Sequence, residues 1–131
     1  MSLVHFVIAL ALLEFFVFLN AVGRARGLFK ISAPATTGHE VFERYFRVQM
    51  NTLEQLVIFV PSILLFALYV HVLTAAVLGF LFVIGRWLYF TGYVKDPKAR
   101  STGFLVSAVP NAILLLGGLI GALVALVRHG L

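Results

Sequence analysis

The chain has 131 residues, of which 62% are hydrophobic and 11% are charged, and its formal net charge is +5. A soluble domain is usually closer to half apolar and a quarter charged, so this composition argues against a soluble fold and indicates an integral membrane protein. The apolar runs are continuous rather than alternating, which argues against a transmembrane β-barrel. There is no cysteine, and the four histidines are too scattered to predict a metal site.

The first predicted helix covers residues 3–22 and is apolar apart from Glu14 and Asn20. No basic segment precedes it and no small-residue cleavage site follows it, so we expect a retained membrane helix, not a removed signal peptide. The next segment, residues 23–40, contains glycines, Pro34 and small hydroxyl residues. These residue types are typical of a loop, and Arg24, Arg26 and Lys30 make this one basic.

Residues 55–85 carry no fully charged side chain. At about 1.5 Å per helical residue, this run is too long for one membrane span and too short for two. Two helices, at 41–69 and 74–93, are each long enough to span the membrane if each includes polar residues at the end farther from the turn between them. We expect them to turn near residues 70–73, although no glycine or proline marks the turn.

The last predicted helix follows a second basic loop and begins at Asp96 and Pro97, an acidic cap followed by a proline suited to the first helical position. Gly117 and Gly121 have the GxxxG spacing of closely packed membrane helices. The prediction is therefore one all-α domain over residues 1–131, a bundle of four transmembrane helices at 3–22, 41–69, 74–93 and 97–127.

Most of the lysines and arginines lie in or beside the loops at 23–40 and 94–100. An even number of spans puts these loops on one side of the membrane and both termini on the other. The positive-inside rule then predicts a multi-pass protein whose loops are cytoplasmic. The positive charge is better explained by topology and contact with anionic headgroups than by nucleic-acid binding.

The second predicted helix carries an unusual polar stripe at membrane depth. At 100° per residue one face presents Arg44, Arg47, Asn51, Glu54 and Gln55. Gln49 falls on the opposite face. Since one bundle has one interior, this second polar face suggests an oligomer in which Gln49 faces a neighbouring subunit.

The third predicted helix has a matching stripe, in which Arg86, Tyr89 and Tyr93 share one face, and Arg100 opens the fourth helix. Six side chains can then converge at the cytoplasmic end: Arg47, Asn51, Glu54, Tyr89, Tyr93 and Arg100. Cations, a carboxylate, an amide and two phenols suit a small zwitterionic ligand with several carboxylates and an amine. Buried polar groups in membranes also pair structurally, and we interpret Arg86 in that way.

Two segments carry a resemblance to a known family: FERYFRVQMNTLE at 42–54 and RWLYFTGYVKDPKAR at 86–100. Together with the basic loop, they resemble the MAPEG family, the membrane-associated proteins in eicosanoid and glutathione metabolism. The likeness covers nearly the whole chain. It implies a homotrimer of four-helix protomers that binds glutathione between adjacent subunits near the cytoplasmic face.

The resemblance also implies roles for individual residues. The implied glutathione-binding residues are Arg47, Asn51, Glu54, Tyr89, Tyr93 and Arg100 from one subunit, with Arg26 and Gln49 from its neighbour. Arg100 matches the arginine that activates the thiol, and Tyr89 is expected to donate a hydrogen bond to the thiolate or the leaving group. Gln55 and Gly27 depart from leukotriene C4 synthase-like members, which have an aromatic residue and a second arginine there.

These observations predict a membrane-bound glutathione transferase that uses glutathione as co-substrate, needs no metal and attacks a lipophilic electrophile. A glutathione-dependent peroxidase activity on lipid hydroperoxides stays open beside it. The alternative is a non-catalytic lipid-binding scaffold resembling five-lipoxygenase-activating protein, which would have no need of the full polar set. A small transporter or channel fits less well, because the polar residues gather at one end of the bundle.

Overall fold

A computed structural model describes residues 1–131, and its only regular structure is helical. The elements in chain order are α1 (Ser2–Phe29), α2 (Glu40–Tyr69), α3 (Val72–Lys95), the short 3-10 helix η1 (Pro97–Ala99) and α4 (Arg100–His129). All four long helices are long and apolar enough to cross a membrane. The predicted fold class, an all-α membrane bundle of four helices, is confirmed.

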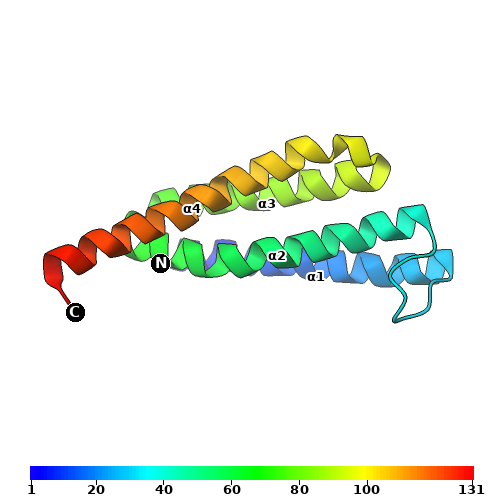
Figure 1. The fold of residues 1–131 in the computed structure, drawn as a ribbon, viewed down its shortest axis with the longest axis horizontal. Coiled ribbons are helices and arrows are strands. Elements are labelled where there is room, and N and C mark those ends of the chain that lie inside the picture. The colour runs from blue at the N-terminus through cyan, green and yellow to red at the C-terminus, as the bar shows by residue number, and fades with distance from the viewer.

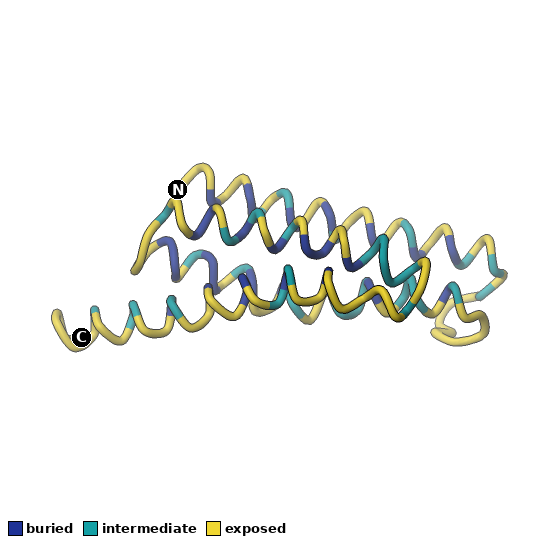
Figure 2. Tube along the Cα trace, turned by 90° about the horizontal axis from the view of Figure 1, so that it is seen from above, coloured by how far each residue is buried: buried dark blue, intermediate teal, exposed yellow.

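The helices form two hairpins, α1 with α2 and α3 with α4 (Figure 1). The α1–α2 loop and the α3–α4 turn lie at one end of the bundle, which we call the loop end. Both termini and the α2–α3 turn lie toward the other end. The two hairpins are close together near the α2–α3 turn and diverge toward the loop end, and α4 extends past the bundle at its C-terminus (Figures 1 and 2).

The first helix is longer than the sequence predicts, because it continues through Gly23 and Gly27 to Phe29. Its extra turns are held by burial, since Ala25 packs with Val22 and Phe42 of α2 in a small core cluster. The helix ends at Lys30, whose backbone is left-handed (φ 57°) and whose N–H donates to the Arg26 carbonyl. The predicted end at residue 22 is wrong because tertiary packing outweighs two glycines.

Histidine side chains cap the first turns of α2 and α3. At the α2–α3 turn, Nδ1 of His71 accepts a 3.1 Å hydrogen bond from the Thr74 backbone N–H. His39 caps α2 in the same manner by accepting from Val41, and its ring stacks on Phe29. The fourth helix starts as the sequence predicts, with Asp96 accepting from the Lys98 N–H, although its first turn is the 3-10 helix η1.

Glycines set the closest approaches between helices. A Cβ added to Gly85 would lie 2.4 Å from the backbone nitrogen of Ser107, and one added to Gly103 would lie 2.2 Å from that of Tyr89. The backbones of α3 and α4 are therefore in direct contact. Gly117 and its GxxxG partner face α2 instead, where Gly117 meets the ring of Phe66.

The exterior of the bundle is apolar. Only 29 of the 131 residues are buried, and many large hydrophobic side chains are exposed, among them Val57 at 68% and Leu119 at 61%. Buried residues line the inner side of each helix, while exposed residues cover the outside (Figure 2). Water would not solvate such a surface, whereas the acyl chains of a bilayer would.

Candidate active site

The candidate active site is a groove at the loop end, where the two hairpins diverge. It lies between α2, α3 and α4 and has a volume of about 640 Å³. Its lining residues are Arg47, Asn51, Tyr89, Tyr93, Arg100, Ser101, Phe104 and Leu105. Five of the residues singled out from the sequence therefore lie around one groove, and each of the three helices contributes to it.

Helical periodicity explains the arrangement. Arg47 and Asn51 are one turn apart on α2, and Tyr89 and Tyr93 are one turn apart on α3, with ring centroids 5.5 Å apart. Arg100 is the first residue of α4. The groove thus has polar walls on two helices and a cation at the start of the third.

The groove is strongly positive. The only ion pair in the chain joins Arg44 to Glu40 at 2.6 Å. Arg47 and Arg100 are exposed, and no carboxylate lies within ion-pair distance of either guanidinium. Two cations that the protein itself does not neutralise favour an anionic ligand.

A buried arginine supports the floor of the groove. Arg86 is fully buried, and its Nη2 donates a 2.7 Å hydrogen bond to Oδ1 of Asn51. It also donates to Thr52 on α2 and to Ser107 on α4, and its guanidinium lies 4.3 Å from the ring centroid of Tyr89. The structural interpretation of Arg86 agrees with these contacts, which join α2, α3 and α4 and fix the amide of Asn51.

Two further polar groups lie deeper in the bundle. Glu14 is only 8% exposed, its Oε1 has no hydrogen-bond partner, and it lies beyond ion-pair distance of Arg86. Gln55, one of the two residues that depart from the leukotriene C4 synthase-like pattern, accepts a 2.9 Å hydrogen bond from Asn111 of α4. The polar stripe of α2 therefore serves helix packing as well as the groove.

Three residues from the predicted binding set do not line the groove of a single chain. Glu54 is exposed on α2, and Gln49 is half-buried on another face of the same helix. Arg26 donates a 2.7 Å hydrogen bond to the carbonyl of Ala35, and its guanidinium lies 5.0 Å from the ring centroid of Phe42. Within one chain, Arg26 thus holds the α1–α2 loop.

The sequence-based set misses three lining residues, Ser101, Phe104 and Leu105, and two of the three side chains that accept hydrogen bonds from Arg86. Ser101 follows Arg100 directly, and Phe104 is one helical turn beyond Arg100, so helical spacing from Arg100 identifies both. The partners Thr52 and Ser107 have no such signal, because they come together only where α2 and α4 pack around Arg86 of α3.

The fold and the groove define a class of protein: a multi-pass helical membrane protein with a cationic, phenol-lined groove at one end of the bundle. The sequence pattern of the MAPEG family matches residues 3–120. The chain belongs to the MAPEG family, and the resemblance seen in the sequence is confirmed.

Several relatives are similar over most of the chain. An uncharacterized protein of Synechocystis is 44% identical over 115 residues, which cover 88% of this chain and 84% of the relative. Human microsomal glutathione S-transferase 2 is 41% identical over 100 residues, covering 76% of this chain and 68% of the relative. Mouse leukotriene C4 synthase is 33% identical over 100 residues, covering 76% and 67%.

Proposed function

We propose that this protein is a glutathione transferase that activates glutathione as a thiolate for attack on lipophilic electrophiles. The observation that carries the proposal is the convergence of Arg47, Asn51, Tyr89, Tyr93 and Arg100 on one groove of about 640 Å³. The names of the relatives, a glutathione S-transferase and a leukotriene C4 synthase, support it.

The groove matches the chemistry of glutathione, a small molecule with two carboxylates, one ammonium group and one thiol. Arg47 and Arg100 have free guanidinium groups suited to carboxylates and to a thiolate. Asn51 is held by Arg86 through its oxygen, so its NH₂ group is the part left to donate to a ligand. The ammonium group needs an acceptor. We assign Glu54 to it, an exposed carboxylate that lies outside the lining but about one turn beyond Asn51 on α2.

The thiol must lose its proton before it reacts. A free thiol of this kind has a pKa of about 8.5, so only a few per cent is thiolate at neutral pH. Arg100 can stabilise the anion directly, and the N-terminus of α4, which begins at this residue, adds a partial positive charge. Tyr89 supplies a phenol that can donate a hydrogen bond to the sulfur.

In the reaction, the thiolate sulfur forms a C–S bond with the electrophilic carbon. The electron pair of the broken bond goes to a leaving group, or to an epoxide oxygen that then takes up a proton. Phe104 and Leu105 give the groove an apolar wall on α4, and Leu105 is 57% exposed. A lipid-soluble electrophile can approach along this wall, so proximity to the bound thiolate supplies much of the catalysis.

We also propose that a neighbouring protomer completes the site. Glutathione has more polar groups than the lining of one chain satisfies, and the groove is open at its side. Gln49 lies on a different face of α2 from Arg47, and Arg26 lies at the loop end of α1, so both can reach a groove in an adjacent copy. A homotrimer with one such site at each subunit boundary is the arrangement we infer.

The decisive experiment adds glutathione to the purified protein and records the ultraviolet absorbance of the thiolate, together with conjugation of an aryl halide. We expect Arg100→Ala to retain glutathione binding within a few fold, to lose the thiolate absorbance and to lower conjugation about 100-fold. Arg128→Ala, at the exposed far end of α4, is the matched control and should behave like the parent protein.

If the parent protein binds lipid but shows neither thiolate absorbance nor conjugation, the non-catalytic scaffold is the correct function. The same preparation tests peroxidase activity. There, two glutathione molecules reduce one lipid hydroperoxide to an alcohol and water and are oxidised to the disulfide.

A further inference from the structure

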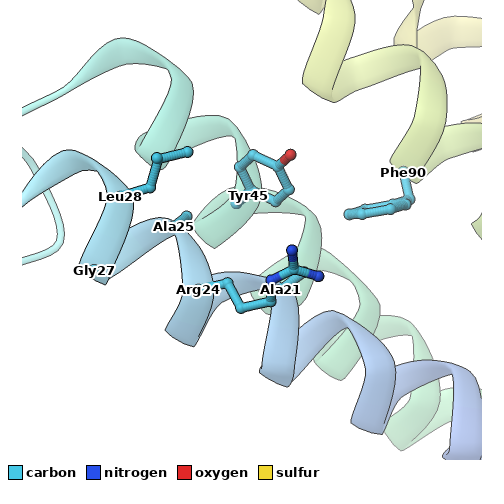
Figure 3. Close-up of a pocket in the computed structure, with 7 residues that line it drawn as sticks. All are labelled: Ala21, Arg24, Ala25, Gly27, Leu28, Tyr45 and Phe90. Carbon is cyan, nitrogen blue, oxygen red and sulfur yellow. The ribbon is translucent and has the colours of Figure 1, made fainter.

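A second groove lies at the loop end, between α1 and α3, with α2 at its base (Figure 3). Its volume is about 520 Å³, and Arg24, Leu28, Tyr45 and Phe90 are among its lining residues. None of its lining residues also lines the candidate active site. The second groove is therefore a separate feature, and its binding properties do not depend on the proposed transferase activity.

The second groove combines one cation with mostly apolar walls. The guanidinium of Arg24 reaches from α1 toward the space between Tyr45 and Phe90 (Figure 3). No carboxylate of the chain lies within ion-pair distance of this guanidinium. The walls come from small and apolar side chains, chiefly Ala21 and Leu28 on α1 and Phe90 on α3. Its chemistry is that of a site for an amphiphile with one anionic group.

Neighbouring aromatic residues place this groove at the edge of the bilayer. Trp87 is 46% exposed, and its ring centroid lies 5.5 Å from that of Phe90 and 6.3 Å from that of Phe18. Tryptophan and tyrosine gather where hydrocarbon meets headgroups. The exposed Leu19 lies farther into the apolar part of α1, whereas Arg24 lies near its loop end. The cation thus sits at headgroup level, with apolar walls beside it.

The walls of the groove are also well defined. Phe90 is stacked on Phe18 with centroids 4.8 Å apart and meets the edge of Tyr45 at 5.9 Å. Phe18 is 1% exposed and belongs to the buried cluster with Val48. One wall is therefore fixed by core packing, and a ligand would find a preformed surface there.

We propose that the second groove binds one anionic phospholipid, whose phosphate is held by the Arg24 guanidinium and the Tyr45 hydroxyl while an acyl chain lies against the apolar walls. A guanidinium binds phosphate oxygens with two parallel hydrogen bonds, which favours this headgroup over a neutral one. Basic pockets between membrane helices on the cytoplasmic side bind anionic headgroups for the same reason. The bound lipid would join α1 to α3 where the hairpins diverge.

The test measures the thermal unfolding midpoint of the full chain in neutral detergent, with added phosphatidylglycerol or with phosphatidylcholine of the same chain length. A ligand that binds only the folded state raises the midpoint. We expect phosphatidylglycerol to raise it by several degrees and phosphatidylcholine to leave it unchanged. Arg24→Gln should abolish the shift, and Tyr45→Phe should raise the half-maximal concentration about five-fold, the loss of one hydrogen bond.

The matched control is Lys95→Gln, which removes an exposed cation at the same end of the bundle but outside the second groove. This variant should keep the full phosphatidylglycerol shift. Native mass spectrometry of the same variants counts phosphatidylglycerol retained on folded protein, so a change in basal stability cannot hide the result. One tightly held lipid per chain, lost in Arg24→Gln alone, is the expected outcome.

Three results would overturn the proposal. Equal shifts with both lipids, or equal losses in Arg24→Gln and Lys95→Gln, would mean that lipids cover the bundle without a specific site. A full shift with inorganic phosphate or glycerol phosphate alone would mean that the groove takes a soluble anion and that the acyl chain contributes nothing.

Discussion

Gly103 offers the sharpest test of how the bundle holds its site. A Cβ built on this residue lies 2.2 Å from the backbone nitrogen of Tyr89 and 2.5 Å from its Cα. Backbone atoms cannot rotate aside as a flexible side chain can. Because non-bonded heavy atoms rest at about 3.5–4.0 Å, Gly103→Ala must separate α3 from α4 locally by about 1 Å.

The change in the free energy of unfolding caused by Gly103→Ala is the sum of two opposing effects. Overpacking a tight contact costs about 1–3 kcal/mol, whereas alanine favours a helix over glycine by about 1 kcal/mol. Because the added Cβ meets backbone atoms, the overpacking cost falls in the upper part of that range, about 2–3 kcal/mol. This leaves a net loss of about 1–2 kcal/mol and a midpoint lower by about 3–8 °C. The shift also moves Tyr89 relative to Arg100 across the candidate active site, so glutathione should bind more weakly.

Thermal unfolding in detergent and a glutathione titration measure both effects. Gly23→Ala is the matched control, since nothing lies within 4 Å of a Cβ added to Gly23 on α1. This control gains only helix propensity and should be slightly stabilised, with unchanged glutathione binding. A Gly103→Ala protein as stable as the Gly23→Ala protein would refute the close backbone contact between α3 and α4.

Three further substitutions test other parts of the bundle, each by thermal unfolding in the same detergent. Arg86→Met removes the 2.7 Å hydrogen bond to Asn51. It should lower the free energy of unfolding by about 2 kcal/mol and weaken glutathione binding about ten-fold. Unchanged binding would show that other contacts position the Asn51 amide. Asp96→Ala removes the cap of the α3–α4 turn and should lower the free energy of unfolding by about 1 kcal/mol. An unfolding midpoint equal to that of the parent protein would contradict this prediction. A Cβ added in Gly117→Ala meets only the ring of Phe66, which can turn. The unfolding midpoint of this variant should therefore fall less than that of Gly103→Ala, whose Cβ meets backbone atoms. A larger fall for Gly117→Ala would contradict this reasoning.

The divergence of the two hairpins gives the loop end two different surfaces. On the side of α2 and α4 the opening is lined by two free arginines and two tyrosines. On the side of α1 and α3 it is lined by one arginine among apolar residues. A soluble, highly charged molecule fits the first and a membrane amphiphile fits the second. The two grooves share no lining residue, and the buried cluster of Phe18, Val48 and Tyr89 packs against a lining residue of each, Phe90 and Tyr93.

The sequence by itself determined the membrane class, the helix count and the polar faces, because each depends on neighbours along one chain segment. Hydrophobic runs report spans directly. The spacing of Arg47 to Asn51 and of Tyr89 to Tyr93 puts each pair on one face whatever the helix packs against. The family resemblance rests on the same local segments, so it too is recognisable in the amino-acid sequence alone.

Tertiary structure alone decided how these faces meet. Helical periodicity gives the face on which a side chain lies, but it does not say which helix packs against that face. The hydrogen bond from Arg86 to Asn51 and the backbone contact at Gly103 could therefore not be predicted from the sequence. The same limit explains the end of α1, where packing of Ala25 extends the helix past Gly23. Contacts between residues distant in the chain depend on how whole helices pack, and local sequence patterns carry little of that information.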